Sequence, residues 1–132
     1  MRTKTSIRFA SLLLVVLIAA TALFTGCEKA QTQAGSKTIT VEIIVEGQET
    51  VVKTITTEAE FLRGALDEEE GLVLGEESQY GLFIKTVNGV TADDSKQQWW
   101  CITKGGADVF TGAETTPIAD GDKFEITLKT GY

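Results

Sequence analysis

The chain contains no histidine, a single proline and two cysteines, Cys27 and Cys101. Without histidine it lacks the usual general base near neutral pH and the commonest nitrogen ligand for metal ions. No Walker-type or Gly-x-Gly-x-x-Gly phosphate loop follows a predicted strand, and Gly105-Gly106 alone is too weak a signal for one. These absences predict that the protein is not an enzyme and carries no cofactor.

The thiol and the carboxylates suggest no catalytic or metal centre either. Cys101 lies in an apolar run beside Trp100 and Ile102, which favours a small buried side chain over a nucleophile. Acidic loop residues could offer oxygen ligands to calcium, but no EF-hand spacing is present and solvated turns are favoured. These acidic residues are Asp93, Asp94, Asp108, Asp120 and Asp122. We predict no metal site.

The N-terminus combines a basic start with an apolar run over residues 9–24 that closes on Gly26 and Cys27. This pattern is typical of a secretory signal, because the run is short for a membrane span. Residues 23–27 resemble the bacterial lipobox, which implies cleavage before Cys27 and attachment of diacylglycerol to its thiol. We expect a lipoprotein signal peptide at 1–26, a lipidated polar tether at 27–36 and a location at the cell membrane, outside the cytoplasm. The alternative is an ordinary cleaved signal followed by an accidental cysteine.

Cleavage would leave 106 of the 132 residues, a length that suits one domain with one core. Loss of Arg2, Lys4 and Arg8 would lower the formal net charge from −7 to −10. Such a charge repels phosphate backbones. Nucleic acid is therefore excluded as an expected partner.

The domain over residues 37–132 begins with a period-two alternation that predicts a hairpin over residues 37–56. Thr57 and Glu60 form a capping-box pattern before an apolar stripe that starts at Phe61, which predicts a helix ending before Gly71.

Beyond the helix, further strands are predicted at 72–74, 82–87, 98–103 and 124–128, with a polar turn at 76–79 and a tight turn at Asn88-Gly89. Residues 104–122 are rich in turn signals and predict a long irregular connection. The pattern indicates an α+β domain in which one short helix lies across a mixed or antiparallel sheet.

Several short motifs in this order resemble the transcobalamin-like C-terminal domain, also known as DUF4430, over residues 37–132. They are the helix at 61–66, Tyr80-Gly81-Leu82, Val87-Asn88-Gly89-Val90, Trp99-Trp100 with Gly106, Thr111-Gly112, Thr116-Pro117-Ile118 and Asp120-Gly121-Asp122. The resemblance implies a β-grasp-like fold used for ligand binding in secreted and lipid-anchored proteins. In vertebrate cobalamin carriers this domain closes over a corrinoid held against a helical barrel, which this chain is too short to include.

Five aromatic residues form the candidate binding set, Tyr80, Phe83, Trp99, Trp100 and Phe110, and four of them, Tyr80, Trp99, Trp100 and Phe110, are the predicted ligand contacts. Successive strand residues point to opposite faces, so only one of the two tryptophans can fill the core. The other either forms a contact surface or is covered by residues 104–122.

We therefore predict a lipid-anchored binding protein of the bacterial envelope, with a corrinoid or another planar metabolite as candidate ligand. The alternative is a structural accessory module that docks onto an envelope protein without a small ligand.

Overall fold

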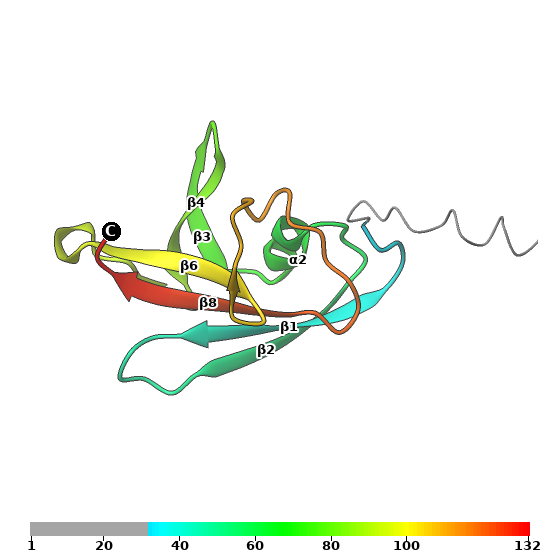
Figure 1. Ribbon diagram of the computed structural model, residues 1–132, viewed down its shortest axis with the longest axis horizontal. Helices are drawn as coiled ribbons and strands as arrows, with labels where there is room; N and C mark the ends of the chain where they lie inside the picture. Colours follow the sequence, from blue (N-terminus) through cyan, green and yellow to red (C-terminus); the bar gives the residue numbers. More distant parts are fainter. Residues whose placement is uncertain (1–31) are drawn as a thin grey trace, which may run out of the picture. The chain divides into compact units, whose positions relative to one another are not determined.

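The computed structural model describes residues 32–132, which form two β-sheets and one α-helix (Figure 1). Cys27 and the predicted signal peptide lie outside these residues. The elements are β1 (Lys37–Ile44), β2 (Val51–Thr57), α2 (Leu62–Glu68), β3 (Val73–Ser78), β4 (Gly81–Val87), β5 (Val90–Thr91), the 3-10 helix η2 (Asp94–Lys96), β6 (Gln98–Lys104), β7 (Ala107–Asp108) and β8 (Lys123–Thr130).

The larger sheet has the strand order β2-β1-β8-β6-β7. Its central pair, β1 and β8, is parallel, and its other pairs are antiparallel. The predicted hairpin over 37–56 is confirmed as β1 and β2. The sheet is therefore mixed and the predicted α+β class is confirmed, with one helix above the sheet (Figure 1).

The core lies between the larger sheet and α2. Alternate residues of β1 and β8 face it, and the fully buried Phe124 and Ile126 stand beside Val41 and Ile43 across the parallel pair. The helix contributes its buried residues Leu62, Ala65 and Leu66. The period-two alternation of β1 and β8 thus places one apolar row under the helix.

The predicted capping box is wrong. The Thr57 hydroxyl accepts the N–H of Ala59 (2.9 Å) and belongs to the end of β2, not to a helix. The helix begins at Leu62, and its N-cap residue, Phe61, makes no capping bond through its side chain.

The start of α2 is instead capped by a distant loop. Leu62 donates its N–H to Thr116 O (2.9 Å) and Arg63 donates its N–H to Ala113 O (2.9 Å). These bonds satisfy donors that have no partner within the helix, so no local capping residue is needed. Phe61, which was predicted in the buried stripe, is 36% exposed.

The helix ends at Glu68, before it reaches Gly71. The N–H of the C-cap residue Glu69 bonds to Leu66 O (3.2 Å). Residues 67–70 are all acidic, and negative charge is unfavourable at the carbonyl end of a helix. The early stop is consistent with this electrostatic penalty.

The predicted polar turn at 76–79 is also wrong, because β3 continues through Ser78 and pairs with β4 to the hairpin end at Gly81. Most of β3 is exposed, so its pairing with β4 is not marked by an apolar alternation. Gly75 lies at a bulge where a Cβ atom would collide with the carbonyl of Phe83. The β3–β4 hairpin projects away from the larger sheet (Figure 1).

The predicted tight turn is confirmed. Asn88 and Gly89 have positive φ angles of 48° and 80° and connect β4 to β5. The described end of the tether contacts the domain, since Gln33 Oε1 accepts the N–H of Asp120 (2.8 Å).

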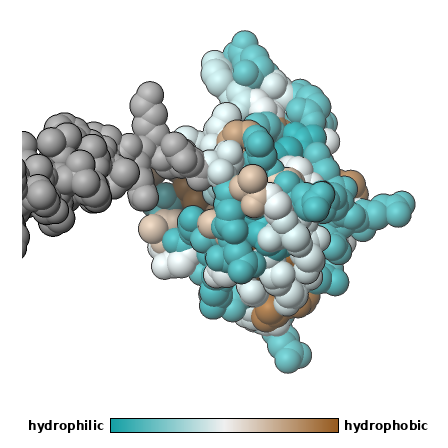
Figure 2. Space-filling view, turned by 90° about the vertical axis from the view of Figure 1, so that its right-hand side faces the viewer, coloured by the Kyte–Doolittle hydropathy of each residue, from teal (hydrophilic) through white to brown (hydrophobic). Residues whose placement is uncertain are grey.

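Polar residues cover most of the end of the molecule drawn in Figure 2, and apolar residues appear there only as separate patches. Within residues 32–132, the structure contains no helix with the length and apolar character needed to span a bilayer.

Phe124 provides a test of the core. We expect Phe124→Ala to lower the free energy of unfolding by about 3–5 kcal/mol, because it leaves a cavity in the core beside the central strand. Urea denaturation followed by tryptophan fluorescence measures this loss. The control is Val52→Ala on edge strand β2, where the side chain is 56% exposed and a change of no more than about 0.5 kcal/mol is expected. Equal losses for both variants would contradict this assignment of the core.

Candidate functional site

A pocket of about 460 Å³ opens beside the larger sheet. Its walls are residues 82–84 of β4, residues 99–102 of β6 and the loop 108–113, and Lys129 of β8 also lines it. The projecting hairpin and the irregular connection after β7 therefore form opposite sides of one cavity.

The two tryptophans of β6 reach this pocket from opposite faces of the strand. Trp100 is only 7% exposed and donates its indole N–H to Lys85 O (3.1 Å). Trp99 is half-buried and donates its indole N–H to Gly131 O (2.8 Å). Because both polar groups have partners within the protein, the indole rings offer the pocket apolar surface.

Lys129 is the cross-strand partner of Trp99, and its Nζ lies 5.8 Å from the centre of the Trp99 ring. The opposite charge comes from the exposed Asp108 at the end of β7, where the loop begins. The pocket therefore has a cationic and an anionic group on an otherwise mainly apolar lining.

The predicted aromatic contacts divide into two groups. Trp99, Trp100 and Phe110 line the pocket, and Phe110 is 94% exposed. Tyr80 lies at the tip of the β3–β4 hairpin, is 86% exposed and does not line the pocket. Phe83, which is 51% exposed, lines the β4 wall.

The sequence reasoning included Phe83 of the β4 wall in its aromatic set but missed its neighbours Leu82 and Ile84, and it missed Lys129. Nothing in the local sequence indicates that β4 lies next to β6, and the pairing of Lys129 with Trp99 depends on a strand register fixed by the whole sheet. Phe83, an aromatic residue in a predicted strand, is the one residue of this wall that the sequence indicated, and its side chain is half exposed in the structure.

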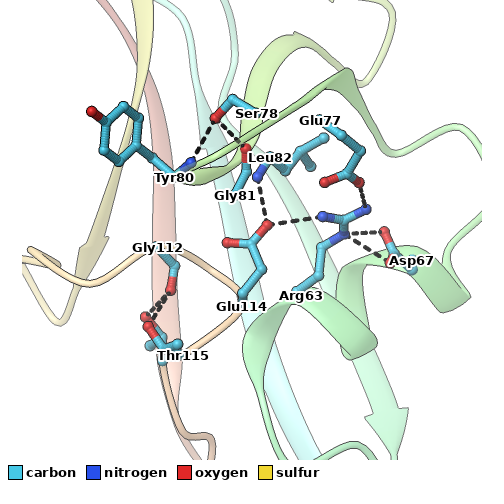
Figure 3. A network of polar contacts seen from close by, with 11 residues as sticks. Arg63, Asp67, Glu77, Ser78, Tyr80, Gly81, Leu82, Gly112, Glu114 and Thr115 are labelled. Atoms are coloured by element: carbon cyan, nitrogen blue, oxygen red, sulfur yellow. Dashed lines mark hydrogen bonds and ion pairs between the residues drawn. The ribbon is translucent and has the colours of Figure 1, made fainter.

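A polar network joins the two sides of the pocket (Figure 3). Glu114 Oε1 accepts the backbone N–H of Leu82 at the start of β4 (2.6 Å) and a bond from Arg63 Nη1 of α2 (2.9 Å). Arg63 also pairs with Asp67 on the helix and with Glu77 on β3. Glu114 directly follows the loop 108–113, so one carboxylate ties this loop to the hairpin and the helix.

Two glycines leave room for this carboxylate. Gly81 has a φ of +103°, and a Cβ atom there would collide with the Glu114 carboxylate. A Cβ atom at Gly112 would lie 2.8 Å from Glu114 Oε2. Glycine at these two positions therefore allows the hairpin and the loop to close on Glu114.

The network also sets charge states. Burial acts to raise the pKa of Glu114, but the bonds from the Leu82 N–H and from Arg63 outweigh it and hold this pKa below its ordinary value. The hydrogen bond to Glu77, with further bonds to Asp67 and Glu114, raises the pKa of Arg63 above its already high value.

The acidic loop residues act mainly in turns. Asp93 Oδ1 accepts the hydroxyl (2.6 Å) and the N–H (2.9 Å) of Ser95, and these bonds lower the pKa of Asp93. Asp120 Oδ1 accepts the N–H of Thr38 (2.7 Å), and Asp122 accepts a backbone bond and pairs with a lysine. Within residues 32–132, no three or more Cys, Asp or Glu side chains gather in an arrangement that could hold a metal ion.

Comparison with known proteins identifies the family. The DUF4430 family, described as a domain of unknown function, matches residues 58–130, more than half of the chain. The chain belongs to this family, as the sequence motifs predicted. No curated protein matches the chain.

Two of the solved structures that resemble this chain are informative. One is the crystal structure of a proposed metal binding protein from Ruminococcus gnavus ATCC 29149, with 56% identity and a TM-score of 0.69 over 73% of this chain and 99% of that one. The other is haptocorrin in complex with Cbi, with 19% identity and a TM-score of 0.58 over 82% of this chain but only 28% of that one. The second likeness concerns the fold and agrees with a transcobalamin-like domain.

Replacement of Glu114 tests the network. We expect Glu114→Gln to lower the free energy of unfolding at pH 7 by about 1–3 kcal/mol, because it weakens bonds to a charged group. A carboxylate whose pKa is lowered by folding stabilises the folded state at pH values above its pKa in the unfolded chain. This stabilisation is lost as the pH falls through the pKa of the group in the folded state. The difference between wild type and variant should therefore shrink from pH 7 to about pH 3.

Urea denaturation at several pH values measures this difference. The control is Glu58→Gln at an exposed position, for which we expect little change at any pH. A stability gap for Glu114→Gln that stayed constant across this range would argue against the ionised carboxylate as its source.

Proposed function

We propose that the protein is a binding protein and that its ligand site is the pocket between β4, β6 and the loop 108–113. The observation that carries this proposal is the aromatic lining: two tryptophans whose N–H groups are already bonded, with Phe83 and Phe110 exposed beside them. Large exposed aromatic side chains around a concave site favour ligand binding. A volume of about 460 Å³ suits a small molecule or one group of a larger ligand.

The ligand that this lining favours contains a flat apolar group. Aromatic faces stack on such groups, and few polar side chains in the pocket compete with that contact. Because haptocorrin shares the fold and was crystallised with Cbi, corrinoids and other planar metabolites are the first compounds to test. We propose no catalytic step, since the thiol of Cys101 is buried and the chain has no histidine to activate it.

A second candidate function is docking onto a protein of the cell envelope. The observation that favours it is the exposure of Tyr80, Phe83 and Phe110, each more than half exposed, on the hairpin and the loop. Aromatic side chains of this kind are typical anchors of protein interfaces.

We also propose that the protein is anchored to the outer face of the cell membrane through lipid on Cys27. The support is the sequence of a basic start, an apolar run and the Gly26-Cys27 junction. Two or more acyl chains hold a protein durably, since each buried methylene contributes roughly 0.8 kcal/mol. The polar tether would separate the domain from the bilayer.

Mass spectrometry of the natural protein tests the anchor. We expect an N-terminal fragment that starts at Cys27 and carries fatty acyl chains. Cys27→Ser should shift the protein from the membrane to the soluble fraction, whereas Cys101→Ser should not, because Cys101 lies inside the domain. An uncut, unmodified N-terminus in the natural protein would contradict the proposal.

Tryptophan fluorescence tests the ligand site. We expect a corrinoid, haem or another planar compound to quench the emission and Phe110→Ala to weaken its binding about tenfold, a loss of about 1.4 kcal/mol. Because Phe110 is 94% exposed, its removal should leave the melting temperature nearly unchanged. The control is Tyr132→Ala, which removes another highly exposed aromatic side chain (87%) outside the pocket. Equal affinities of wild type and Phe110→Ala for the compound would show that Phe110 and its loop are not part of the ligand site.

A further inference from the structure

The pocket follows the edge of β6 rather than one face of it. Residues 99–102 all line the pocket, although successive residues of a strand point to opposite faces. A cavity lined by four consecutive residues of a strand indicates a position along the strand edge.

The hydrogen bonds identify which backbone groups point into this edge. Gly131 donates its N–H to Gln97 O (2.9 Å), and Gly105 donates its N–H to Lys123 O (3.0 Å). Because hydrogen-bonded pairs alternate along an antiparallel ladder, the odd-numbered residues of β6 bond to β8. Residues 98, 100, 102 and 104 therefore direct their N–H and C=O groups away from β8.

Partners for these outward groups are present at both ends of β6 but not in its middle. The Gln98 N–H bonds to Asp93 O (3.0 Å), and Ile102 O accepts the N–H of Val109 (3.2 Å). Among residues 32–132, no bond joins the N–H or C=O of Trp100, or the N–H of Ile102, to another backbone or side-chain group. An open stretch of β6 about 13 Å long remains between its bond to Asp93 and its bond to Val109.

We propose that this edge binds a short extended peptide of a partner protein, which adds to the larger sheet beside β6. The inference rests on the proposed pocket and names the class of its ligand. A peptide residue opposite Trp100 would exchange two hydrogen bonds with it, and a second carbonyl two residues away would accept the N–H of Ile102. A peptide backbone has these donors and acceptors at the required spacing, whereas a planar apolar group leaves them without partners.

The register also assigns the side chains of the bound peptide. The residue opposite Trp100 shares its face and enters the pocket beside β4, where an aromatic or large aliphatic side chain fits. The residues on either side of it share the face of Trp99 and Lys129. Lys129 has no carboxylate partner in the described part of the chain, so an acidic side chain is favoured there.

Amide hydrogen exchange of the full chain gives the first part of the test. In the free protein the amides of Trp100 and Ile102 should exchange faster than those of Trp99 and Cys101, which bond to β8. The probes are capped hexapeptides of the form Glu-Val-Glu-Xaa-Glu-Val, with Xaa as Phe, Trp, Tyr or Leu, and matched peptides with Thr in place of each Glu. A probe that binds should slow exchange at Trp100 and Ile102 about tenfold or more without changing Trp99.

N-methylated probes separate strand addition from simple filling of the pocket. Methylation of the amide of Xaa removes the donor to Trp100 and should abolish binding, whereas methylation of the following Glu, whose amide points away from β6, should be tolerated. Lys129→Glu should weaken the Glu peptides about tenfold but not the Thr peptides. The control, Lys53→Glu on β2, makes the same charge change away from the pocket. It should not weaken the Glu peptides relative to the Thr peptides.

The outcomes distinguish this inference from the proposed function. Protection of Trp100 and Ile102 with the expected methylation pattern supports strand addition. If no probe protects these amides while a planar compound binds the pocket, the inference is overturned and the proposed function stands. If neither peptides nor planar compounds bind, both are overturned.

Discussion

The carboxylate of Glu114 holds together the parts of the molecule on which the pocket depends. It bonds to the first N–H of the β4 wall at Leu82 and to Arg63 of α2, while the loop wall ends directly before it. The β3–β4 hairpin projects from the larger sheet and has few buried residues of its own, so apolar packing alone fixes its position weakly. A hydrogen-bonded ionic contact supplies the orientation that packing does not, and the width of the pocket therefore depends on it.

The features that could be predicted from sequence are those with a local cause. The alternation in β1 and β8 identified both central strands, and the positive φ angles at Asn88-Gly89 follow from residues that tolerate them. The helix start and β3 could not be predicted in the same way. The α2 donors are capped by Thr116 and Ala113, far along the chain, and β3 is held by pairing with β4 while its side chains remain solvated. The sequence reasoning also singled out aromatic residues that line the pocket, and for Trp99 and Trp100 the reason was that adjacent strand residues cannot both face the core. Leu82, Ile84 and Lys129 had no such signal, because only the tertiary arrangement brings them to the pocket.

The pocket and the open strand edge share β6, and this shared position gives the two proposals one physical basis. Trp100 belongs to the core through its side chain, yet its backbone faces the cavity. The core thereby fixes the strand whose edge is exposed, so a ligand meets a rigid template rather than a mobile loop. A planar group can use the aromatic surface alone, whereas a peptide can use the aromatic surface together with the backbone.

An unpaired strand edge is usually a liability, because it can pair with other copies of the same protein. In this domain Asp93 and Val109 bond to the two ends of the edge, and the backbone groups of Trp100 between them are left without a partner in the described residues. A long strand cannot align with so short an opening, and the excess of acidic residues makes copies of the chain repel one another. A short segment with a suitable side chain for the pocket avoids both obstacles. The short opening and the negative charge, which protect the edge from aggregation, thus favour a small, specific partner. For this physical reason the partner is to be sought among extended peptides.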